Sequence, residues 1–468
     1  MLNQLTLTEM AAGVRSGRIS SAELVEAHLD QIEAQQQRIN AFVRVFAEEA
    51  MEAARAADEA RLHRLALGPL HGVPLTIKDS FDVAGQPTYC GSKLRLDHRA
   101  QEDSTAARRL REAGAILVGK TNAPEFLYNW ETDNYIVGRT NNPWNLMCTS
   151  GGSSGGEAAA IATFCSAGGM GSDGGGSIRV PAHFCGIAGL KPTPGRVPAA
   201  GHFPLINHPG GLLGVGGPMA RTAADVRRLF QVTAGYDSDD PFSAPVPLRQ
   251  PSLEGLRVGV WEQFYGVPVQ PPIRKAVEKA ARALGQLGFA VEPMQPRGLE
   301  RAPELWWFFF GRLAAPFIKQ MVAGREQDVH WTGLELVNMA LEEPVPTMEQ
   351  LVENLAARDA MRGALLRQMR DCPVLLTPAC GVIAFPHRQR RYETGERPIG
   401  LLEAMMPLTW VNLLGLPAVV IPFDRAADGL PVGVQLVGRP FEEELLLELA
   451  VRLEEARGPF ASPVRDAG

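Results

Sequence analysis

A chain of 468 residues that is 45% hydrophobic and 21% charged can bury a large core, which excludes a disordered or fibrous protein. Its formal net charge of −6 gives no electrostatic reason to bind nucleic acid or an anionic membrane. Residues 1–10 show no signal peptide, and no apolar run reaches the roughly 18 residues of a membrane span, so we expect a cytoplasmic protein.

The first part of the chain predicts helices followed by one short strand. Residues 6–47 have the pattern of two helices, the second with a capping box from Ser20 to Glu23, and residues 48–66 continue as an Ala-rich helix. Residues 72–79 form an apolar strand candidate that ends in Lys78 and Asp79. A buried lysine has to be paired or uncharged, whereas a lysine at a strand end can extend its amine into solvent. Taken alone, the strand pattern favours the second interpretation.

A helix predicted over residues 104–113 precedes a strand predicted over residues 115–118. The segment Gly114 to Thr121 matches the phosphate-loop pattern G-x-x-x-x-G-K-[ST] letter for letter. A phosphate loop follows a strand and opens a helix, whereas here a helix precedes, the middle residues are apolar and β-rich, and Pro124 follows soon after. We therefore interpret the segment as a strand and not as a phosphate cradle.

Glycines crowd the stretch from Ser150 to Thr193, which follows a polar and aromatic loop at residues 122–144. Two serine-bearing loops, residues 151–156 and 171–177, flank an Ala-rich run that predicts a short buried helix. Glycine lets the backbone approach a ligand closely and aim several N–H groups at one point. Apolar segments between the glycines argue against a flexible linker. The two loops therefore predict a binding or catalytic site.

The rest of the chain alternates between strand and helix patterns after a Gly/Pro-rich loop at residues 198–218. The helical segment 304–342 contains five consecutive aromatic residues, Trp306 to Phe310, which cannot all face one side of a helix. The other predicted elements are helices at 223–233, 273–287 and 441–456, a linker at 240–255, and strands at 258–260, 374–376, 418–421 and 432–437. Strands interleaved with helices predict an α/β architecture with a covered sheet.

One serine motif is typical of an α/β-hydrolase. Gly151 to Gly155 fit G-x-S-x-G, the nucleophile elbow, with Ser153 as the nucleophile. This motif needs a strand directly before the serine and a histidine base late in the chain. Residues 145–150 are not strand-like, and the histidines of the C-terminal third, His330 and His387, have no evident acidic partner in the sequence. An esterase of this type stays as an alternative.

Three separated segments fit a different chemistry. They are Lys78 after G-V-P-L-T-I, Ser153 in G-G-S-S-G-G, and Ser177 in D-G-G-G-S-I-R, with a spacing of 24 between the serines (177 − 153). Together they resemble the amidase signature family, whose Ser–cisSer–Lys triad has this order and spacing. The resemblance covers most of residues 6–235 and 372–457 through further blocks at 119–122, 142–145, 189–193, 217–222 and 428–435.

The resemblance implies an α/β amidase-signature fold, in which helices sandwich a large mixed, twisted sheet within one compact domain. The whole chain, residues 1–468, would then form a single amidase domain. Its expected parts are an N-terminal helical region (1–66), a catalytic core (67–240), a variable aromatic-rich helical insertion near the pocket (241–370), and strands and a helix that complete the sheet (371–460).

The resemblance also implies a role for each residue of the site. Ser177 is the expected nucleophile, and Ser153, on a cis peptide bond after Gly152, is the expected proton relay. Lys78 is the expected base, because burial can lower the pKa of an amine until it is uncharged. The expected oxyanion hole consists of the N–H groups of Gly174, Gly175, Gly176 and Ser177, and the expected loop support comes from Asp173, Arg179 and Ser154. This sequence has Gly174 where the family usually has Thr or Ile, and Ser150 where it often has Pro; neither change removes a member of the triad.

The aromatic residues predict the substrate class. They could wall an apolar pocket, so we expect amides or carbamates, and esters, with an apolar or aromatic acyl or amine part, as in aryl acylamidases and urethanases. The expected pocket residues are Phe126, Tyr128, Asn129, Trp130, Thr149, Trp306 and Phe309. We expect no metal or cofactor, and no nucleic-acid or membrane partner; a homodimer stays open.

A second alternative comes from within the same family. It includes the glutaminase component of the tRNA-dependent amidotransferase, which usually reads S-I-R-Q-P where this chain has the apolar Val180. Val180 therefore argues against that component. The membrane-anchored fatty-acid amide hydrolases share Glu157, but this chain shows no N-terminal membrane helix, so it resembles a soluble bacterial relative.

Overall fold

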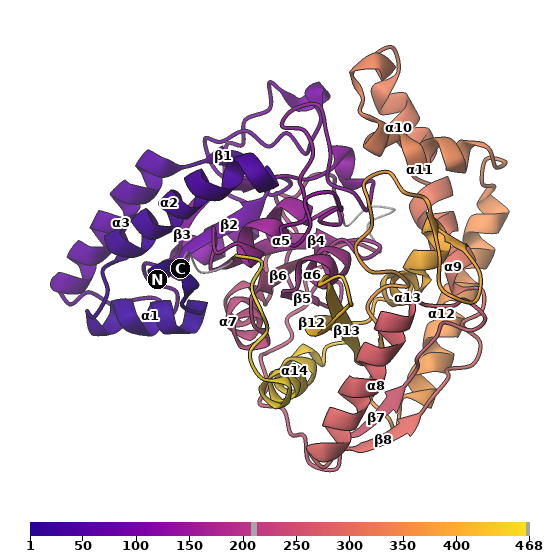
Figure 1. Ribbon diagram of the computed structural model, residues 1–468. Helices are drawn as coiled ribbons and strands as arrows, with labels where there is room; N and C mark the ends of the chain where they lie inside the picture. The colour runs from indigo at the N-terminus through magenta and orange to yellow at the C-terminus, as the bar shows by residue number, and fades with distance from the viewer. Residues whose placement is uncertain (207–212, 465–468) are drawn as a thin grey trace.

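The structure, a computed structural model, describes residues 1–206 and 213–464, and its main feature is a mixed sheet of eleven strands (Figure 1). The strands are β1 (Phe42–Val45), β2 (Pro74–Lys78), β3 (Ile116–Thr121), β4 (Gly168–Asp173), β5 (Ala188–Lys191), β6 (Val215–Ala220), β7 (Arg257–Val260), β8 (Ala290–Pro293), β9 (Val374–Pro378), β12 (Ala418–Arg425) and β13 (Pro431–Val437). Their order in the sheet is β1-β3-β2-β4-β6-β5-β12-β13-β9-β7-β8. The predicted loop 198–218 ends in β6, and its residues 207–212 lie outside the described residues.

The directions of the strands place two residues of the site at one edge of the sheet. Strands β3, β2 and β4 run parallel to one another, and so do β9, β7 and β8, whereas the strands between these two groups pair antiparallel. Parallel strands present their carboxyl ends on the same side. Since β2 ends at Lys78 and β4 ends at Asp173, these two side chains emerge close together.

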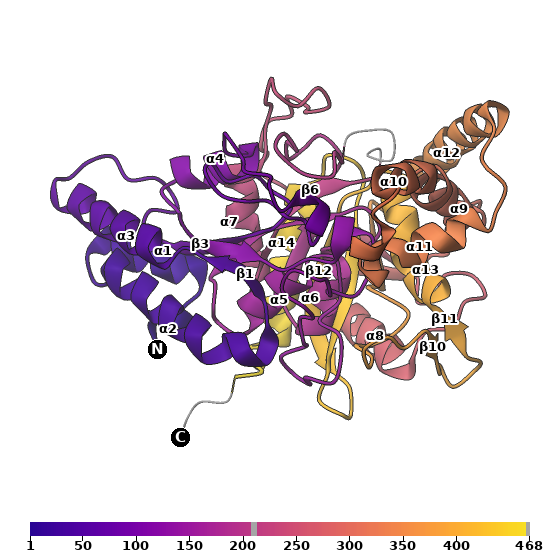
Figure 2. The same ribbon diagram turned by 90° about the horizontal axis from the view of Figure 1, so that it is seen from above.

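Helices cover both faces of the sheet (Figure 2). In β12, Val419 and Ile421 belong to one apolar cluster, whereas Val420 between them belongs to another. Successive residues of a strand point to opposite faces, so the two clusters lie on opposite sides of the sheet. The first cluster includes residues of α7 (Ala223–Thr233), α8 (Pro271–Gln286) and α14 (Glu443–Arg457), and the second includes residues of α5 (Gly155–Ala162) and α6 (Arg179–Cys185). The covered α/β sheet predicted from the sequence is confirmed.

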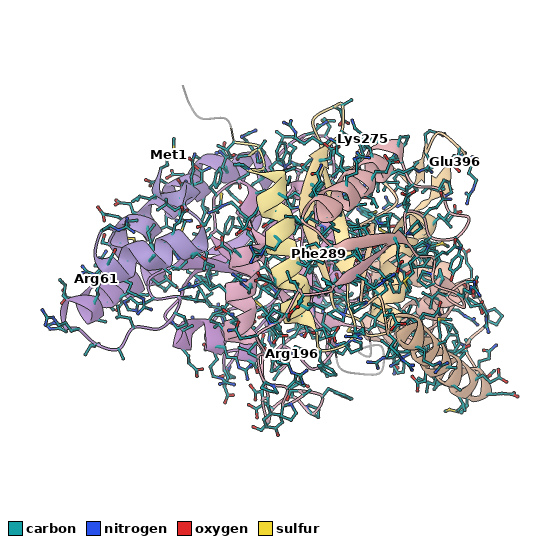
Figure 3. All side chains as sticks on the ribbon, turned by 90° about the horizontal axis from the view of Figure 1, so that it is seen from below. Met1, Arg61, Arg196, Lys275, Phe289 and Glu396 are labelled. Carbon is teal, nitrogen blue, oxygen red and sulfur yellow. The ribbon has the colours of Figure 1, made fainter. Side chains whose placement is uncertain are left out.

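The N-terminal helices form one end of the molecule. They are α1 (Leu7–Ser16), α2 (Ser21–Ile39) and α3 (Ala47–Leu62), and α2 begins with the predicted capping box from Ser20 to Glu23. The predicted helix up to residue 47 is wrong at its end, because Asn40 adopts a left-handed conformation (φ 49°) and β1 follows at Phe42–Val45. Figure 3 shows Arg61 at this end of the molecule and Glu396, which follows the short β10 (Arg391–Tyr392), at the other.

The aromatic-rich segment lies at the end opposite to α1–α3 (Figures 1 and 2). It is helical, as predicted, but broken into α9 (Ala302–Trp307), a π-helical turn (Phe308–Arg312), α10 (Ala315–Val322) and α11 (Trp331–Leu341). The chain continues through α12 (Met348–Gln368) and, after β9, through a two-stranded sheet of β10 and β11 (Ile399–Gly400) to α13 (Leu401–Leu413). The sequence predicted neither the two short strands nor α13. Helix α13 is buried nearly all round and lacks an amphipathic pattern.

The segment that matches a phosphate loop is a strand. Its residues Ile116–Thr121 form β3 after α4 (Thr105–Glu112), as predicted, and all six residues of β3 are buried.

Among the residues that the structure describes, none forms a helix both long and apolar enough to cross a bilayer.

Candidate active site

Lys78 lies at the carboxyl end of β2 and is fully buried. Its Nζ donates hydrogen bonds to Ser153 Oγ at 2.6 Å and to Ser172 Oγ at 3.0 Å. Burial lowers the pKa of Lys78 to about 7, although Cys90, Asp173 and Glu157 favour its charged form. The lysine does not extend into solvent, so the interpretation that the strand pattern alone favoured is wrong. An amine with this pKa is available as a base near neutral pH.

Ser153 and Ser154 connect the lysine to the second serine loop. The Gly152–Ser153 peptide bond is cis, as the family resemblance implies, and α5 begins directly after Ser154. Ser154 N–H donates to the carbonyl of Ser177 at 3.1 Å, and Ser154 Oγ donates to the carbonyl of Ser172 at 3.3 Å. The two serine loops that the sequence predicted as a site are therefore hydrogen-bonded to each other.

Ser177 lies between β4 and α6 and is 8% exposed, whereas Lys78 is 0% exposed. Ser153 and Ser177 line the same cavity, which has a volume of about 300 Å³. Among the hydrogen bonds of the described residues, none joins the hydroxyls of Ser153 and Ser177. The first link of the expected relay, from Lys78 to Ser153, is thus formed, and the second link, from Ser153 to Ser177, is not.

In the glycine loop before Ser177, which consists of Gly174, Gly175 and Gly176, some backbone N–H groups have an acceptor and others do not. The N–H of Gly176 donates to Asp173 Oδ1 at 2.8 Å, so it is occupied. The N–H groups of Gly174, Gly175 and Ser177 have no acceptor among the described residues. These three, and not all four expected groups, are free to bind an oxyanion.

Asp173 and Arg179 hold this loop through a buried network. Arg179 Nε donates to Asp173 Oδ2 and Arg179 Nη2 to Asp173 Oδ1, both at 3.0 Å, and Arg179 Nη1 donates to Gln435 Oε1 at 2.8 Å. Asn412 donates through Nδ2 to Asp173 Oδ1 at 2.9 Å and accepts a hydrogen bond from Arg179 through Oδ1. Burial by itself raises the pKa of Asp173, but the charge of Arg179 holds it below its usual value, so the carboxylate stays ionised. Asp173 can therefore hold the backbone N–H groups of the loop.

Ser172 and Glu157 are members of the site that sequence reasoning did not place in it. Glu157 of α5 lies between β2 and β3, where it accepts hydrogen bonds from Thr76 Oγ1 at 2.5 Å and from Thr121 Oγ1 at 2.6 Å. Burial raises the pKa of Glu157 to about 7. Ser172 is the residue before the last in β4, and the alternation of side chains along this strand was the available signal for its contact with Lys78.

The cavity has walls that differ in part from the expected ones. Phe126 and Tyr128 line it, as does Phe310, the last of the five consecutive aromatic residues. The remaining apolar side chains of the lining are Leu127, the residues from Phe203 to Ile206, and residues around α10, namely Leu313, Ala314, Phe317, Ile318 and Met321. No sequence pattern placed residues 203–206 near the site, whereas α10 belongs to the insertion 241–370 that was expected near the pocket.

Five of the expected pocket residues do not line the cavity: Asn129, Trp130, Thr149, Trp306 and Phe309. All five are buried. Asn129 binds Glu335, Thr149 accepts from the N–H of Gly151, and Phe309 packs in the core around α13. The indole N–H groups of Trp130 and Trp306 donate to backbone carbonyls of the glycine loop. Hydrogen bonds thus hold four of these side chains away from the cavity, and core packing holds Phe309.

The two late histidines lie outside this cavity. The structure gives each an acidic neighbour, with His387 Nδ1 3.6 Å from Glu131 Oε2 and His330 Nε2 3.7 Å from Asp133 Oδ1. No histidine, however, is among the described residues that line the cavity. The strand that precedes Ser153 ends at Thr121, far before it in the chain. The geometry therefore does not support a nucleophile elbow at Ser153.

Comparison with known proteins gives consistent matches along the chain. A family model described as Amidase matches residues 23–447. The chain is 34% identical to an indoleacetamide hydrolase of Bradyrhizobium diazoefficiens (98% of this chain, 87% of the relative) and 35% identical to the A component of a glutamyl-tRNA(Gln) amidotransferase of Synechococcus sp. (98% and 97%). The solved structure of a bacterial aryl acylamidase of the amidase signature enzymes matches with a TM-score of 0.86 at 26% identity (97% and 96%). The similarity therefore spans nearly the whole chain and not only the segments that carry the motifs.

Proposed function

The chain belongs to the amidase family of hydrolases that act on amides, and from this premise we propose that it cleaves amides and carbamates with an apolar or aromatic acyl or amine part. The observation that carries the proposal is a buried lysine bonded to Ser153 at 2.6 Å beneath an apolar cavity that Ser177 also lines. Ser177 is the proposed nucleophile, Ser153 the relay and Lys78 the base.

In the first half of the proposed reaction, Ser177 Oγ attacks the carbonyl carbon. Its proton passes to Ser153 Oγ, and the proton of Ser153 passes to the uncharged amine of Lys78. The carbonyl oxygen becomes an oxyanion, which the free N–H groups of the glycine loop stabilise. The C–N bond then breaks, and the proton returns from Lys78 through Ser153 to the departing nitrogen. An acyl-enzyme on Ser177 and a free amine result.

In the second half, a water molecule takes the place of the amine. It loses a proton through Ser153 to Lys78 as it attacks the acyl carbon, and the proton returns to Ser177 Oγ when the ester bond breaks. The products are the acid and the regenerated serine. A carbamate that follows the same steps loses its amine and gives a carbonic acid monoester, which decomposes to carbon dioxide and an alcohol. An ester reacts more readily because an alkoxide leaves more easily than an amine.

The proposed substrate class follows from the charge of the cavity. Asp173 is the only charged residue among its described lining residues, and Arg179 pairs with that carboxylate. Free glutamine would bring an ammonium and a carboxylate into this apolar space without partners, which is costly. Aryl or alkyl groups instead gain from contact with Tyr128, Phe310 and Met321.

A panel of substrates tests this assignment. We expect the purified protein to hydrolyse anilides, aryl amides, aryl carbamates and aryl esters with kcat/KM values at least about 100-fold above that for free glutamine, since burying an unpaired charge costs several kcal/mol. Steady-state kinetics over the panel give the comparison. A preference for glutamine or for short aliphatic amides would contradict the proposal.

The glutaminase component of an amidotransferase remains the second candidate because of the 35% identity to such a protein. Val180, where that component usually has Gln, is fully buried and packs beside the Gly151 and Gly176 backbone. Glutaminase activity that appears only on addition of partner proteins of the amidotransferase would favour this candidate over an independent amidase.

We also propose that the chain works as one catalytic domain. The eleven-stranded sheet draws its strands from both terminal regions, and the segment 241–370 supplies Phe310 and residues of α10 to the cavity that Ser177 lines. Limited proteolysis that released an active fragment lacking this segment would speak against a single domain.

A further inference from the structure

Two buried tryptophans donate hydrogen bonds to consecutive carbonyls of the glycine loop. Trp306 Nε1 donates to the carbonyl of Gly174 at 3.0 Å, and Trp130 Nε1 donates to the carbonyl of Gly175 at 2.9 Å. The indoles are 2% and 3% exposed, respectively, and come from segments far apart in the chain. Neither lines the cavity, so the proposed mechanism leaves both without a role.

These bonds fix the direction of backbone N–H groups. In a planar trans peptide the C=O and the N–H point in opposite directions. The bond from Trp306 to the carbonyl of Gly174 therefore turns the N–H of Gly175 away from the indole, and this N–H has no acceptor among the described residues. The next peptide is held at both ends, at its carbonyl by Trp130 and at the N–H of Gly176 by Asp173.

The loop needs such anchors because it consists of three glycines. Residues 174–176 can adopt both signs of φ at little cost, and Gly176 has φ 113°. A flip of the peptide between Gly174 and Gly175 would replace a donor by a carbonyl oxygen, which repels an oxyanion. The hydrogen bond from Trp306 opposes this flip, because the flip would leave the buried indole N–H without a partner.

Packing fixes the same loop against the wall of the cavity. Phe310, which lines the cavity, stacks on Tyr128 at 4.7 Å and on Trp306 at 4.6 Å between ring centroids. A Cβ atom on Gly175 would lie 2.4 Å from Trp306, and one on Gly174 would lie 3.3 Å from Phe310. The aromatic rings thus occupy the space that side chains at these two positions would need.

We propose that Trp306 and Trp130 are positioning residues that hold the glycine loop in the conformation that binds the oxyanion. They act through the backbone of Gly174 and Gly175 and do not touch the reacting atoms. The inference rests on the proposed function, in which Ser177 attacks a carbonyl carbon beside these N–H groups.

The test uses Trp306→Phe, with Trp307→Phe as a matched control, because the Trp307 indole donates to Glu343 at the surface. Removing one oxyanion donor typically costs about 10²–10³ in rate, so loosening its anchor in Trp306→Phe should lower kcat for an anilide by about 10-fold or more, with little change in KM. Trp307→Phe should retain the kinetics of the unmodified protein.

A pair of inhibitors separates positioning from packing. An aryl trifluoromethyl ketone forms a bond from its carbonyl carbon to Ser177 Oγ, its oxygen becomes an oxyanion, and the serine proton passes through Ser153 to Lys78. The corresponding alcohol has the same shape but cannot add. Trp306→Phe should weaken inhibition by the ketone by the same factor as kcat and leave inhibition by the alcohol unchanged. Replacement of Trp306 by benzothienylalanine keeps the ring volume and removes only the N–H. This replacement, like Trp130→Phe, should also weaken inhibition by the ketone and leave inhibition by the alcohol unchanged.

Four results would count against the inference, and they can be told apart. Equal weakening of the ketone and the alcohol, or normal kinetics in the benzothienylalanine variant, would overturn it, because the indole would then act by packing alone. A kcat in Trp306→Phe as high as that of Trp307→Phe would overturn it as well. If the unmodified protein binds ketone and alcohol equally, Ser177 does not add to carbonyls, and the proposed function fails together with the inference.

Discussion

Ser177→Ala is expected to lower kcat/KM for anilides and aryl esters by on the order of 10⁴-fold or more, because the proposed acyl-enzyme forms on the Ser177 hydroxyl. Ser177 lines the cavity together with Gly174, and Ser153, which also lines it, is hydrogen-bonded to Lys78. Steady-state kinetics give the size of the loss, and circular dichroism checks that the variant is folded.

His387→Ala is the comparison that separates this chemistry from a histidine-based one. His387 lies beside Glu131 and outside the cavity, so its loss should leave turnover nearly unchanged. Activity that survives Ser177→Ala but disappears in His387→Ala would restore the α/β-hydrolase hypothesis with Ser153 as the nucleophile.

Lys78→Ala is expected to lower kcat/KM by on the order of 10⁴-fold, since Ser153 would lose the amine to which it is hydrogen-bonded and which is the proposed base. Lys78→Arg should be equally inactive. A guanidinium keeps its proton throughout the usual pH range, so it can donate to Ser153 but cannot accept a proton from it. The two variants together distinguish a base from a mere positive charge.

The opposite result has a clear meaning. An active Lys78→Arg variant would show that the site needs a cation at this position and not an uncharged amine. Activity that peaks near the imidazole pKa and falls at alkaline pH would likewise point away from Lys78.

The residues of the proposed triad could be found from the sequence, because three short motifs in fixed order identified them. What Lys78 does could not be settled from its strand, since burial depends on the elements that pack around it. The structure shows α5 and β4 enclosing it, so that its amine meets Ser153 and Ser172. The strand pattern gave the position of the lysine and not its environment, which was expected only from the family resemblance.

The strand β4 shows why glycine-rich elements escape prediction. Its sequence G-G-M-G-S-D has little strand propensity, yet it lies in the middle of the sheet. A Cβ atom on Gly169 would lie 2.1 Å from Glu157 Oε1 and 2.2 Å from the carbonyl of Thr76. Only glycine fits at this position because α5 and β2 approach the strand closely. This close approach is a feature of the tertiary structure, so the local sequence does not predict it.

The pocket was only partly predictable for a related reason. The aromatic run from Trp306 to Phe310 pointed to a cavity, but the π-helical turn at Phe308–Arg312 decides which ring reaches it. Phe310 faces the cavity, whereas Trp306 turns its N–H to the glycine loop. Asn412, which holds Asp173 and Arg179, carried a weak signal as a lone amide in an apolar helix.

The rate at which a fluorophosphonate labels the unmodified protein, followed against pH with the labelled residue located by mass spectrometry, tests the central claim most directly. Phosphonylation joins Ser177 Oγ to phosphorus, releases fluoride and passes the serine proton to Lys78. Because burial lowers the pKa of Lys78 to about 7, the amine is uncharged above that pH, so labelling of Ser177 should rise through about pH 7 and then stay level. A label on Ser153, or a labelling rate that does not change with pH in this range, would contradict the account.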